Sequence, residues 1–268
     1  CKAVCKMNNN EIRRKSRRVR VGDLYIGGDS RLTVQSMTNT DTRDIPATVR
    51  QVKALADAGC DIVRITVPDE EAAQTIKAIK AAGIKTPIVD DIHFDWKAAI
   101  ASAVCGVDKI RINPGNIGSD DKVREVCAAC SERGIPIRIG VNSGSLEKNI
   151  LKKYGTPTPE ALAESALYHA GLLEKFGFSD IVISIKSTGV LAMIEANRIL
   201  AKATDYPLHL GVTEAGLPET GIVKSAIGIG SLLCDGIGDT LRVSLTGDPV
   251  PEVAAARQII SALGIKGQ

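Results

Sequence analysis

The chain has 268 residues, of which 44% are hydrophobic and 24% are charged. This composition is typical of a globular protein and not of disordered, collagen-like or coiled-coil chains. No stretch approaches the roughly 18 to 20 apolar residues of a membrane-spanning helix. Aromatic residues make up only 3% of the chain, so we expect an aliphatic core and no nucleic-acid surface built on base stacking.

Positive charge is concentrated at the N-terminus. Residues 1–20 contain eight Lys or Arg and one acid, Glu11, whereas the rest of the chain has 26 basic and 30 acidic residues. The first 17 residues therefore form a basic arm, and they lack the apolar stretch of a signal peptide. We expect a solvated arm that leads into a short hairpin at residues 18–28, rather than a nucleic-acid contact.

Seven cysteines are an odd number in a chain too large to need disulfides, which predicts free thiols in a reducing cytoplasm. Cys127 and Cys130 form a lone C-x-x-C within a helical pattern, where both are expected to be ordinary packing residues. No constellation of four cysteines is present, so we expect no metal site in this chain.

Short aliphatic runs alternate with helical patterns along the whole chain. The runs are 32–37, 62–67, 87–92, 109–113, 136–141, 180–186, 208–213 and 240–245, and the helical patterns are 47–58, 70–82, 98–105, 120–133, 159–176, 191–203, 221–234 and 251–263. Eight strand–helix units without a break in composition predict an α/β fold, a single (β/α)8 TIM barrel over residues 18–268. A doubly wound sheet is the alternative, but the first strand is not followed by the G-x-G-x-x-G of a dinucleotide site.

Charged residues interrupt strands that should be apolar on both faces. Five cations do so, namely Arg64, Arg111, Arg138, Lys186 and Arg242. Polar residues two or four positions away share the same faces of the strands, including Asn113, Asn142, Ser184 and Ser244. Asp91 and His93 are related in the same way, and Glu214 follows the seventh strand. These side chains should meet at the C-terminal mouth of the barrel, where barrel enzymes hold their active sites.

A surplus of buried cations predicts an anionic ligand. Any one of these residues could be a structural ion pair, but Asp91 and Glu214 are the only obvious acids, and each unpaired buried charge costs several kcal/mol. Arginine forks and lysine suit phosphate oxygens, which indicates a small substrate with a phosphate or diphosphate. We interpret His93 as a further phosphate contact or a proton donor, and the mouth is too positive for a metal site.

Seven sequence blocks closely resemble one enzyme family, the 4-hydroxy-3-methylbut-2-enyl diphosphate synthases. They are VQSMTNT (34–40), DIHF (91–94), RINPGNIG (111–118), IRIGVNSGSLE (137–147), LHLGVTEAG (208–216), KSAIG (224–228) and GDTLRVSL (238–245). The resemblance extends from about Arg13 to the C-terminus. It implies reductive ring opening of 2-C-methyl-D-erythritol 2,4-cyclodiphosphate to the linear diphosphate, in the methylerythritol phosphate route to isoprenoids.

The resemblance also implies roles for individual residues. The diphosphate contacts would be Arg64, His93, Arg111, Arg138, Lys186, Arg242 and Ser244. Asp91 and Asn142 would be further groups in the pocket, and Glu214 would face the reacting carbons as a candidate proton donor. Glu214, His93 and Asp91 are therefore the candidate catalytic residues.

Family members continue into a C-terminal α/β domain in which three cysteines and a glutamate hold a [4Fe-4S] cluster. This chain ends at Gln268, where that domain should begin, and its cysteines do not match the pattern. We therefore expect an isolated substrate-binding domain that holds no cluster and is inactive alone. The family further implies flavodoxin or ferredoxin as electron donor and a homodimer, with no nucleic-acid or membrane partner.

Two other functions fit a phosphate-binding barrel. One is a binding module without redox activity. The other is a different barrel enzyme for a phosphorylated substrate, such as a pterin synthase or an aldolase that uses Lys186 to form a Schiff base.

Overall fold

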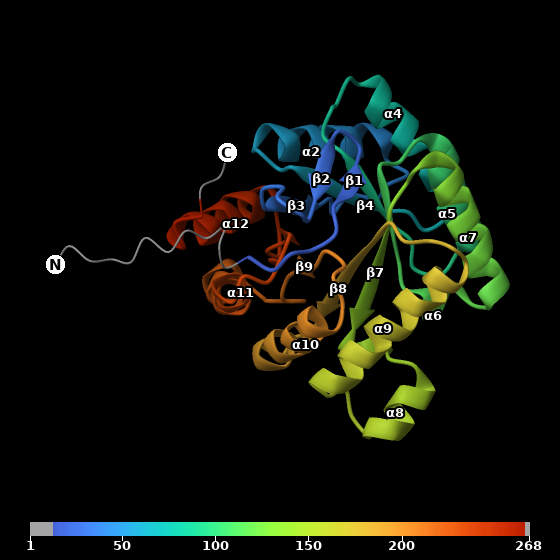
Figure 1. The fold of residues 1–268 in the computed structure, drawn as a ribbon. Helices are drawn as coiled ribbons and strands as arrows, with labels where there is room; N and C mark the ends of the chain where they lie inside the picture. The colour runs from blue at the N-terminus through green and yellow to red at the C-terminus, as the bar shows by residue number, and fades with distance from the viewer. Residues whose placement is uncertain (1–12, 266–268) are drawn as a thin grey trace.

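The computed structural model describes residues 13–265 and contains a parallel eight-stranded sheet closed into a barrel (Figure 1). The strands are β3 (Thr33–Met37), β4 (Ile62–Thr66), β5 (Ile88–Asp91), β6 (Lys109–Ile112), β7 (Ile137–Asn142), β8 (Ile181–Lys186), β9 (His209–Leu210) and β10 (Thr240–Leu241). Their order is β8-β7-β6-β5-β4-β3-β10-β9. A parallel bridge between Ile183 and Leu208 joins β8 to the segment before β9. The predicted TIM barrel is therefore confirmed.

Helices surround the strands as a ring, as Figure 1 shows. They are α2 (Ile45–Asp57), α3 (Glu70–Ala73), α4 (Thr75–Ala81), α5 (Trp96–Cys105), α6 (Pro114–Ile117), α7 (Asp120–Arg133), α8 (Lys148–Tyr154), α9 (Pro159–Lys175), α10 (Val190–Ala203), α11 (Pro218–Cys234) and α12 (Val250–Ala262). The helix predicted at 70–82 is two helices, since Gln74 ends α3 before α4 begins. The other predicted helices are present, with ends that differ by up to three residues.

Aliphatic side chains fill the space between the strands and the helices. Ile65 and Ile110 on the strands and Leu55 and Ile76 on the helices are fully buried in one continuous core. Each strand places alternate residues on opposite faces, so the neighbours of these isoleucines along β4 and β6 point into the barrel. The outer face of each strand therefore supplies the hydrophobic stability, and the inner face is left for other groups.

The long connection after β7 folds into two short elements. A 3-10 turn, η1 (Ser143–Ser145), is followed by α8, which lies outside α9 (Figure 1). The carboxylate of Glu147 contacts the buried ring of His169 in α9, and Asn113 Nδ2 donates to Ser145 Oγ at 3.3 Å. The connection is thus attached both to the helix ring and to the end of β6.

A two-stranded hairpin covers the N-terminal end of the barrel. Strands β1 (Val19–Val21) and β2 (Leu24–Ile26) pair in antiparallel fashion, as predicted for residues 18–28. The buried side chains of Val21 and Ile26 pack against Ile62 and Val89 at the start of β4 and β5. The open mouth is therefore at the opposite, C-terminal end of the strands.

The described part of the basic arm is attached to the barrel, so the prediction of a solvated arm is wrong for these residues. Arg13 Nη2 donates to Asp239 Oδ1 at 3.0 Å, and Ser16 Oγ donates to the same oxygen at 2.8 Å. Arg14 donates to the carbonyl oxygens of Thr204 and Tyr206. Residues 1–12 of the predicted arm lie outside the described residues.

The thiols of the described residues are free, and four of the five are buried. Burial raises the pKa of Cys60, Cys127 and Cys130 to about 12, so these thiols stay protonated. The interpretation of Cys127 and Cys130 as packing residues agrees with their position inside α7. Within residues 13–265, no helix is long and apolar enough to cross a membrane.

Replacing Asp239 by alanine should destabilise the fold. The carboxylate is 2% exposed, it accepts from Arg13 and Ser16, and its Oδ2 accepts from the amide of Leu208 at 2.8 Å. Loss of a buried acid that leaves its partner charge unpaired costs about 3 kcal/mol. Urea denaturation should show this decrease in the free energy of unfolding for Asp239→Ala.

The matched control is Asp205→Ala. Its ion pair with Arg17 is exposed, so its loss should cost less than about 1 kcal/mol. Equal losses in the two variants would contradict the structural role of Asp239.

Candidate anion-binding site

A cavity of about 150 Å³ opens at the C-terminal ends of the strands. It is lined by Met37, Arg64, Arg111, Arg138, Asn142, Ser184, Lys186, Thr213, Arg242 and Ser244. Seven of the predicted site residues are in this set, and they come from β4, β6, β7 and β8 and from the segment that follows β10. The cavity is smaller than the roughly 300–1,000 Å³ of sites for drug-sized ligands. A compact ligand group with many hydrogen-bond acceptors suits a cavity of this size.

Asp91 lies behind the cavity wall and connects three of the predicted residues. Its carboxylate accepts from Arg64, and Arg111 Nη1 donates to its Oδ1 at 3.0 Å. His93 Nε2 is 3.0 Å from its Oδ2. Burial by itself raises the pKa of Asp91, but Arg64 and Arg111 lower it well below its usual range. Asp91 is therefore an ionised anchor that fixes the direction of two arginines.

Arg138 and Lys186 have no acidic partner among the described residues. Arg138 is 1% exposed, and its Nε and Nη1 have no hydrogen-bond partner within the described chain. Burial lowers the pKa of Arg138 and of Lys186, and neighbouring arginines lower both further. These two residues hold most of the uncompensated positive charge at the cavity, which an anionic ligand would neutralise.

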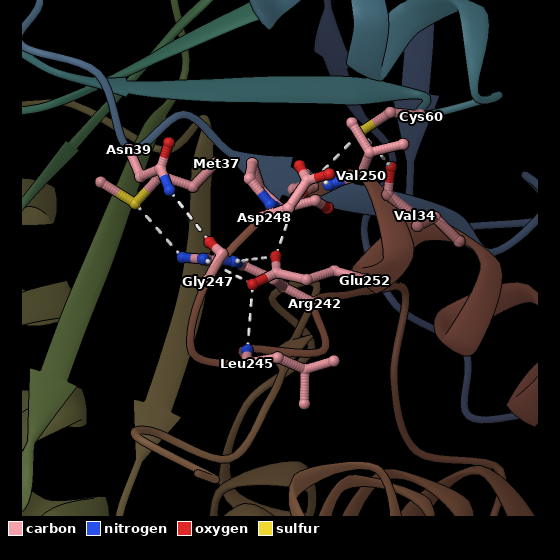
Figure 2. Close-up of polar contacts among 12 residues, drawn as sticks. Val34, Met37, Asn39, Cys60, Arg242, Leu245, Gly247, Asp248, Val250 and Glu252 are labelled. Carbon is pink, nitrogen blue, oxygen red and sulfur yellow. Dashed lines mark hydrogen bonds and ion pairs between the residues drawn. The ribbon is translucent and has the colours of Figure 1, made fainter. Parts of the chain in front are cut away.

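Arg242 has a partner that the sequence analysis missed. Glu252, from the first turn of α12, is 2% exposed, and its carboxylate accepts from Arg242 Nε at 3.2 Å and from Nη2 at 3.3 Å (Figure 2). Asp91 and Glu214 were the expected acids, whereas the structure pairs the cations with Asp91 and Glu252. Five cations against two carboxylates still leave the mouth positive.

Two glycines make room for the cations. A Cβ on Gly140 would lie 2.2 Å from Arg111 Nε, and the Arg111 side chain crosses β7 there to donate to the Gly140 carbonyl at 3.2 Å. A Cβ on Gly211 would lie 2.8 Å from the Arg242 carbonyl and 3.2 Å from Lys186 Nζ. Larger residues at either position would displace a cation from the cavity.

His93 and Glu214 are not in the cavity lining. The His93 side chain is 48% exposed, next to the exposed Phe94. Glu214 is exposed and follows Thr213, which does line the cavity. It has a φ of 50°, the only positive φ of a residue other than glycine in the described chain. Such a conformation is strained for glutamate and is often found at functional sites.

A polar layer lies inside the barrel, and the sequence analysis missed it. Gln35, Lys109 and His209 are fully buried, and Lys109 Nζ and both ring nitrogens of His209 have no partner within residues 13–265. Burial lowers the pKa of Lys109 well below its usual value, and Arg138 and Arg64 lower it further. A signal was available, because Lys109 is two residues from Arg111 and shares its inward face.

A larger hollow, of about 560 Å³, lies on the outer surface at α8, α9 and α10. Its lining includes Tyr154, Leu167, Tyr168, Glu160 and Glu164 but no arginine or lysine. This lining offers nothing to bind an anion, so the smaller cavity in the barrel mouth is the candidate site.

The described side chains do not fit an iron–sulfur cluster. Residues 13–265 contain no group of three or more His, Cys, Asp or Glu side chains that could hold a metal ion. Cys60, Cys105, Cys127 and Cys130 are buried around the barrel helices. No chemistry of a cluster can therefore be assigned to these residues.

The family model described as the GcpE TIM-barrel domain matches residues 16–257. The chain belongs to this family. The 4-hydroxy-3-methylbut-2-en-1-yl diphosphate synthase (flavodoxin) of Clostridium perfringens is 59% identical over 94% of this chain and 72% of its own length. The enzyme of the same name from Caldanaerobacter subterraneus is 59% identical over 95% of this chain and 72% of its own length. The resemblance noted in the sequence is thus confirmed.

Solved structures share the fold at low sequence identity. Dihydropteroate synthase from Yersinia pestis is 12% identical, with a TM-score of 0.64 over 92% of this chain and 98% of that one. A truncated 3-deoxy-D-arabino-heptulosonate 7-phosphate synthase from Thermotoga maritima is 14% identical, with a TM-score of 0.66 over 94% of this chain and 95% of that one. These similarities show the barrel architecture alone.

Replacing Lys109 by methionine should stabilise the protein. A buried amine without an acidic partner is costly, and an apolar side chain of similar length removes that cost, a gain of at least about 1 kcal/mol. Because the folded pKa is depressed, the unfolded chain binds more protons below about pH 10, so the contribution of Lys109 to stability rises with pH. Denaturation curves between pH 7 and 10 should show a higher midpoint and a smaller rise for Lys109→Met. A lower midpoint would contradict an unpaired Lys109.

Proposed function

We propose that this chain is the substrate-binding barrel of a 4-hydroxy-3-methylbut-2-en-1-yl diphosphate synthase and that its mouth binds the diphosphate of 2-C-methyl-D-erythritol 2,4-cyclodiphosphate. The observation that carries the proposal is the cluster of Arg64, Arg111, Arg138, Lys186 and Arg242 around one small cavity with only two acids in contact. Family membership supports the proposal independently.

The cations would act on the phosphate oxygens. Arg111 is held by Asp91 and by the Gly140 carbonyl, so its position is set before the substrate arrives. Arg138 is 1% exposed, against 7% for Arg111, and it has nitrogens without protein partners, which suits a charge-assisted contact with an anion. Asn142 and Ser244 would add neutral hydrogen bonds. Fixed positive charge stabilises the phosphate oxygen as the C–O bond of the ring breaks, without rearrangement at that moment.

Two predicted catalytic residues would work at the rim. Glu214 adjoins the cavity through Thr213 and has the strained backbone described above, and we propose that it faces the reacting carbons and donates a proton to the hydroxyl that leaves as water. His93 would close on the substrate from the end of β5, where its ring is oriented by the ionised Asp91. Asp91 itself would be a positioning group, since it is 1% exposed and its carboxylate contacts the side chains of the neighbouring cations, such as Arg64.

The electrons of the reduction would come from outside the described residues, because these do not fit the cluster that the family implies. The names of the relatives identify flavodoxin as their electron donor, and we propose the same donor for this protein. The homodimer, the cytoplasmic location and the absence of nucleic-acid or membrane partners remain proposals of the same kind. The chain alone should bind substrate and show no turnover.

A phosphate-binding module without redox activity would also bind the diphosphate. Adding the remaining C-terminal part of the Clostridium perfringens relative, produced separately, distinguishes the two, since only the barrel of a reductase should then turn over the cyclodiphosphate with a reduced dye. The lowered pKa of Lys186 is compatible with a Schiff-base enzyme. Borohydride trapping of a carbonyl substrate on Lys186 would support that alternative.

Replacing Arg138 by methionine should weaken binding of the cyclodiphosphate to this chain by about 2–4 kcal/mol, because a buried charge-assisted contact is lost. Calorimetry measures the two affinities directly. Glu214→Gln is the matched control at the rim, because its carboxylate is exposed and outside the cavity lining, and its affinity should stay within about twofold of the wild type. Equal affinity of the Arg138→Met variant and the wild type would exclude the proposed site.

A further inference from the structure

Glu252 is surrounded by donors from two other segments of the chain. Its Oε2 accepts from Ser36 Oγ at 2.8 Å and from Arg242 Nε at 3.2 Å, and its Oε1 accepts from the Leu245 amide at 3.0 Å and from Arg242 Nη2 at 3.3 Å (Figure 2). Both carboxylate oxygens thus have two donors. The single side chain connects β3 and the segment that follows β10 to helix α12.

The same contacts determine how Arg242 faces the cavity. Nε and Nη2 form the edge of the guanidinium that lies against Glu252, and Nη1 contacts Met37 Sδ at 3.2 Å. Met37 lines the cavity together with Arg242. A thioether is a weak acceptor, so this contact costs little to exchange for a phosphate oxygen. Nη1 is therefore the nitrogen that Arg242 has available for an anion.

Two further hydrogen bonds involve the segment after β10, one from Asn39 and one within the segment itself. Asn39 Nδ2 donates to the Gly247 carbonyl at 2.9 Å, and the Val250 amide donates to Asp248 at 3.0 Å, as Figure 2 shows. Between Arg242 and Gly247, the Leu245 amide donates to Glu252, and the Thr246 amide donates to the Gly216 carbonyl at 3.1 Å. Ser244, which lines the cavity, is next to the anchored Leu245 amide.

We propose that Glu252 is a positioning residue of the anion site, which orients Arg242 Nη1 toward the ligand. This inference rests on the proposed function, because it assumes an anion in the mouth. Glu252 is an acid close to the site, and its removal makes the mouth more positive, yet anion binding should become weaker. Without Glu252, the Arg242 side chain must be ordered by the ligand itself. The free-energy cost of this ordering exceeds the electrostatic gain from the removal of one negative charge.

The probe is inorganic pyrophosphate, and calorimetry on the 268-residue chain gives its dissociation constant. We expect Glu252→Gln to weaken binding about tenfold, the size of a lost charged hydrogen bond. Glu252→Asp keeps the charge but is one methylene shorter, and it should weaken binding similarly. It also serves as the second variant if the glutamine variant fails to fold, which circular dichroism reveals.

A double-mutant cycle separates positioning from general destabilisation. If Glu252 acts through Arg242, then Glu252→Gln in an Arg242→Met background should change the dissociation constant by less than about twofold. A purely structural glutamate would lower the melting temperature but would not show this lack of additivity in binding.

Asp61→Asn is the matched control. Asp61 is also a buried acid, with Arg31 and Arg257 each 2.7 Å away and the Val34 amide as a donor, and it lies just before β4, at the end opposite the mouth. Its replacement changes the net charge as Glu252→Gln does, and pyrophosphate affinity should stay within about twofold of the wild type.

Each outcome bears on a different claim. Wild-type or tighter binding by both Glu252 variants, with Arg242→Met weakened, would overturn the positioning role and leave the proposed function intact. Additive losses in the double variant would overturn it as well. No binding of pyrophosphate to the folded wild-type chain would overturn the proposed function, and this inference with it.

Discussion

The interior of the barrel contains more buried positive charge than its own acids neutralise. Arg64 and Arg111 share Asp91, Arg242 pairs with Glu252, and Arg138, Lys186 and Lys109 have no acidic partner within the described chain. Buried charges repel one another strongly because few water molecules screen them. The buried cations stay in place only if the rest of the fold is stable enough to offset their repulsion. A bound polyanion reduces this repulsion.

The contacts that stabilise the fold lie apart from this charged region. Aliphatic side chains on the outer faces of the strands pack against the helix ring, and the β1–β2 hairpin covers the N-terminal end of the barrel. Asp239 attaches the segment around Arg13 and Ser16 to the start of the last strands. These contacts lie away from the cavity at the C-terminal ends. The strained Glu214 and the unpaired cations are therefore at the end where a barrel binds its ligand.

The fold and most of the cavity were predictable because both depend on short-range patterns. Alternation of two residues along each strand places Arg64, Arg111 and Arg138 on the inner face, and the register of the parallel strands pairs Arg111 with Arg138 on the neighbouring strand. Lys109 follows the same rule and was missed because it begins its strand. The same alternation relates His93 to Asp91, but His93 and Glu214 lie beyond β5 and β9. The backbone no longer follows the strand there, so the rule did not show that both side chains lie outside the cavity lining.

Glu252 could not be assigned from the sequence. It lies in a helical pattern in which a glutamate is usually solvated, and only the packing of α12 against β3 and the end of β10 makes it a buried partner of Arg242. Met37 was missed for a similar reason, since a methionine at a strand end is usually a core residue. Contacts between segments distant in sequence leave no periodic signal, and they decide how the cations are neutralised.

The most direct test of excess positive charge at the mouth is the melting temperature of this chain in pyrophosphate and in orthophosphate at equal ionic strength. A ligand that binds only the folded state stabilises it in proportion to its affinity and concentration. We expect the melting temperature to rise with pyrophosphate, to rise less with orthophosphate, and to rise least in the Arg138→Met variant. An equal effect of the two anions, or no effect of either, would contradict a site built for a diphosphate.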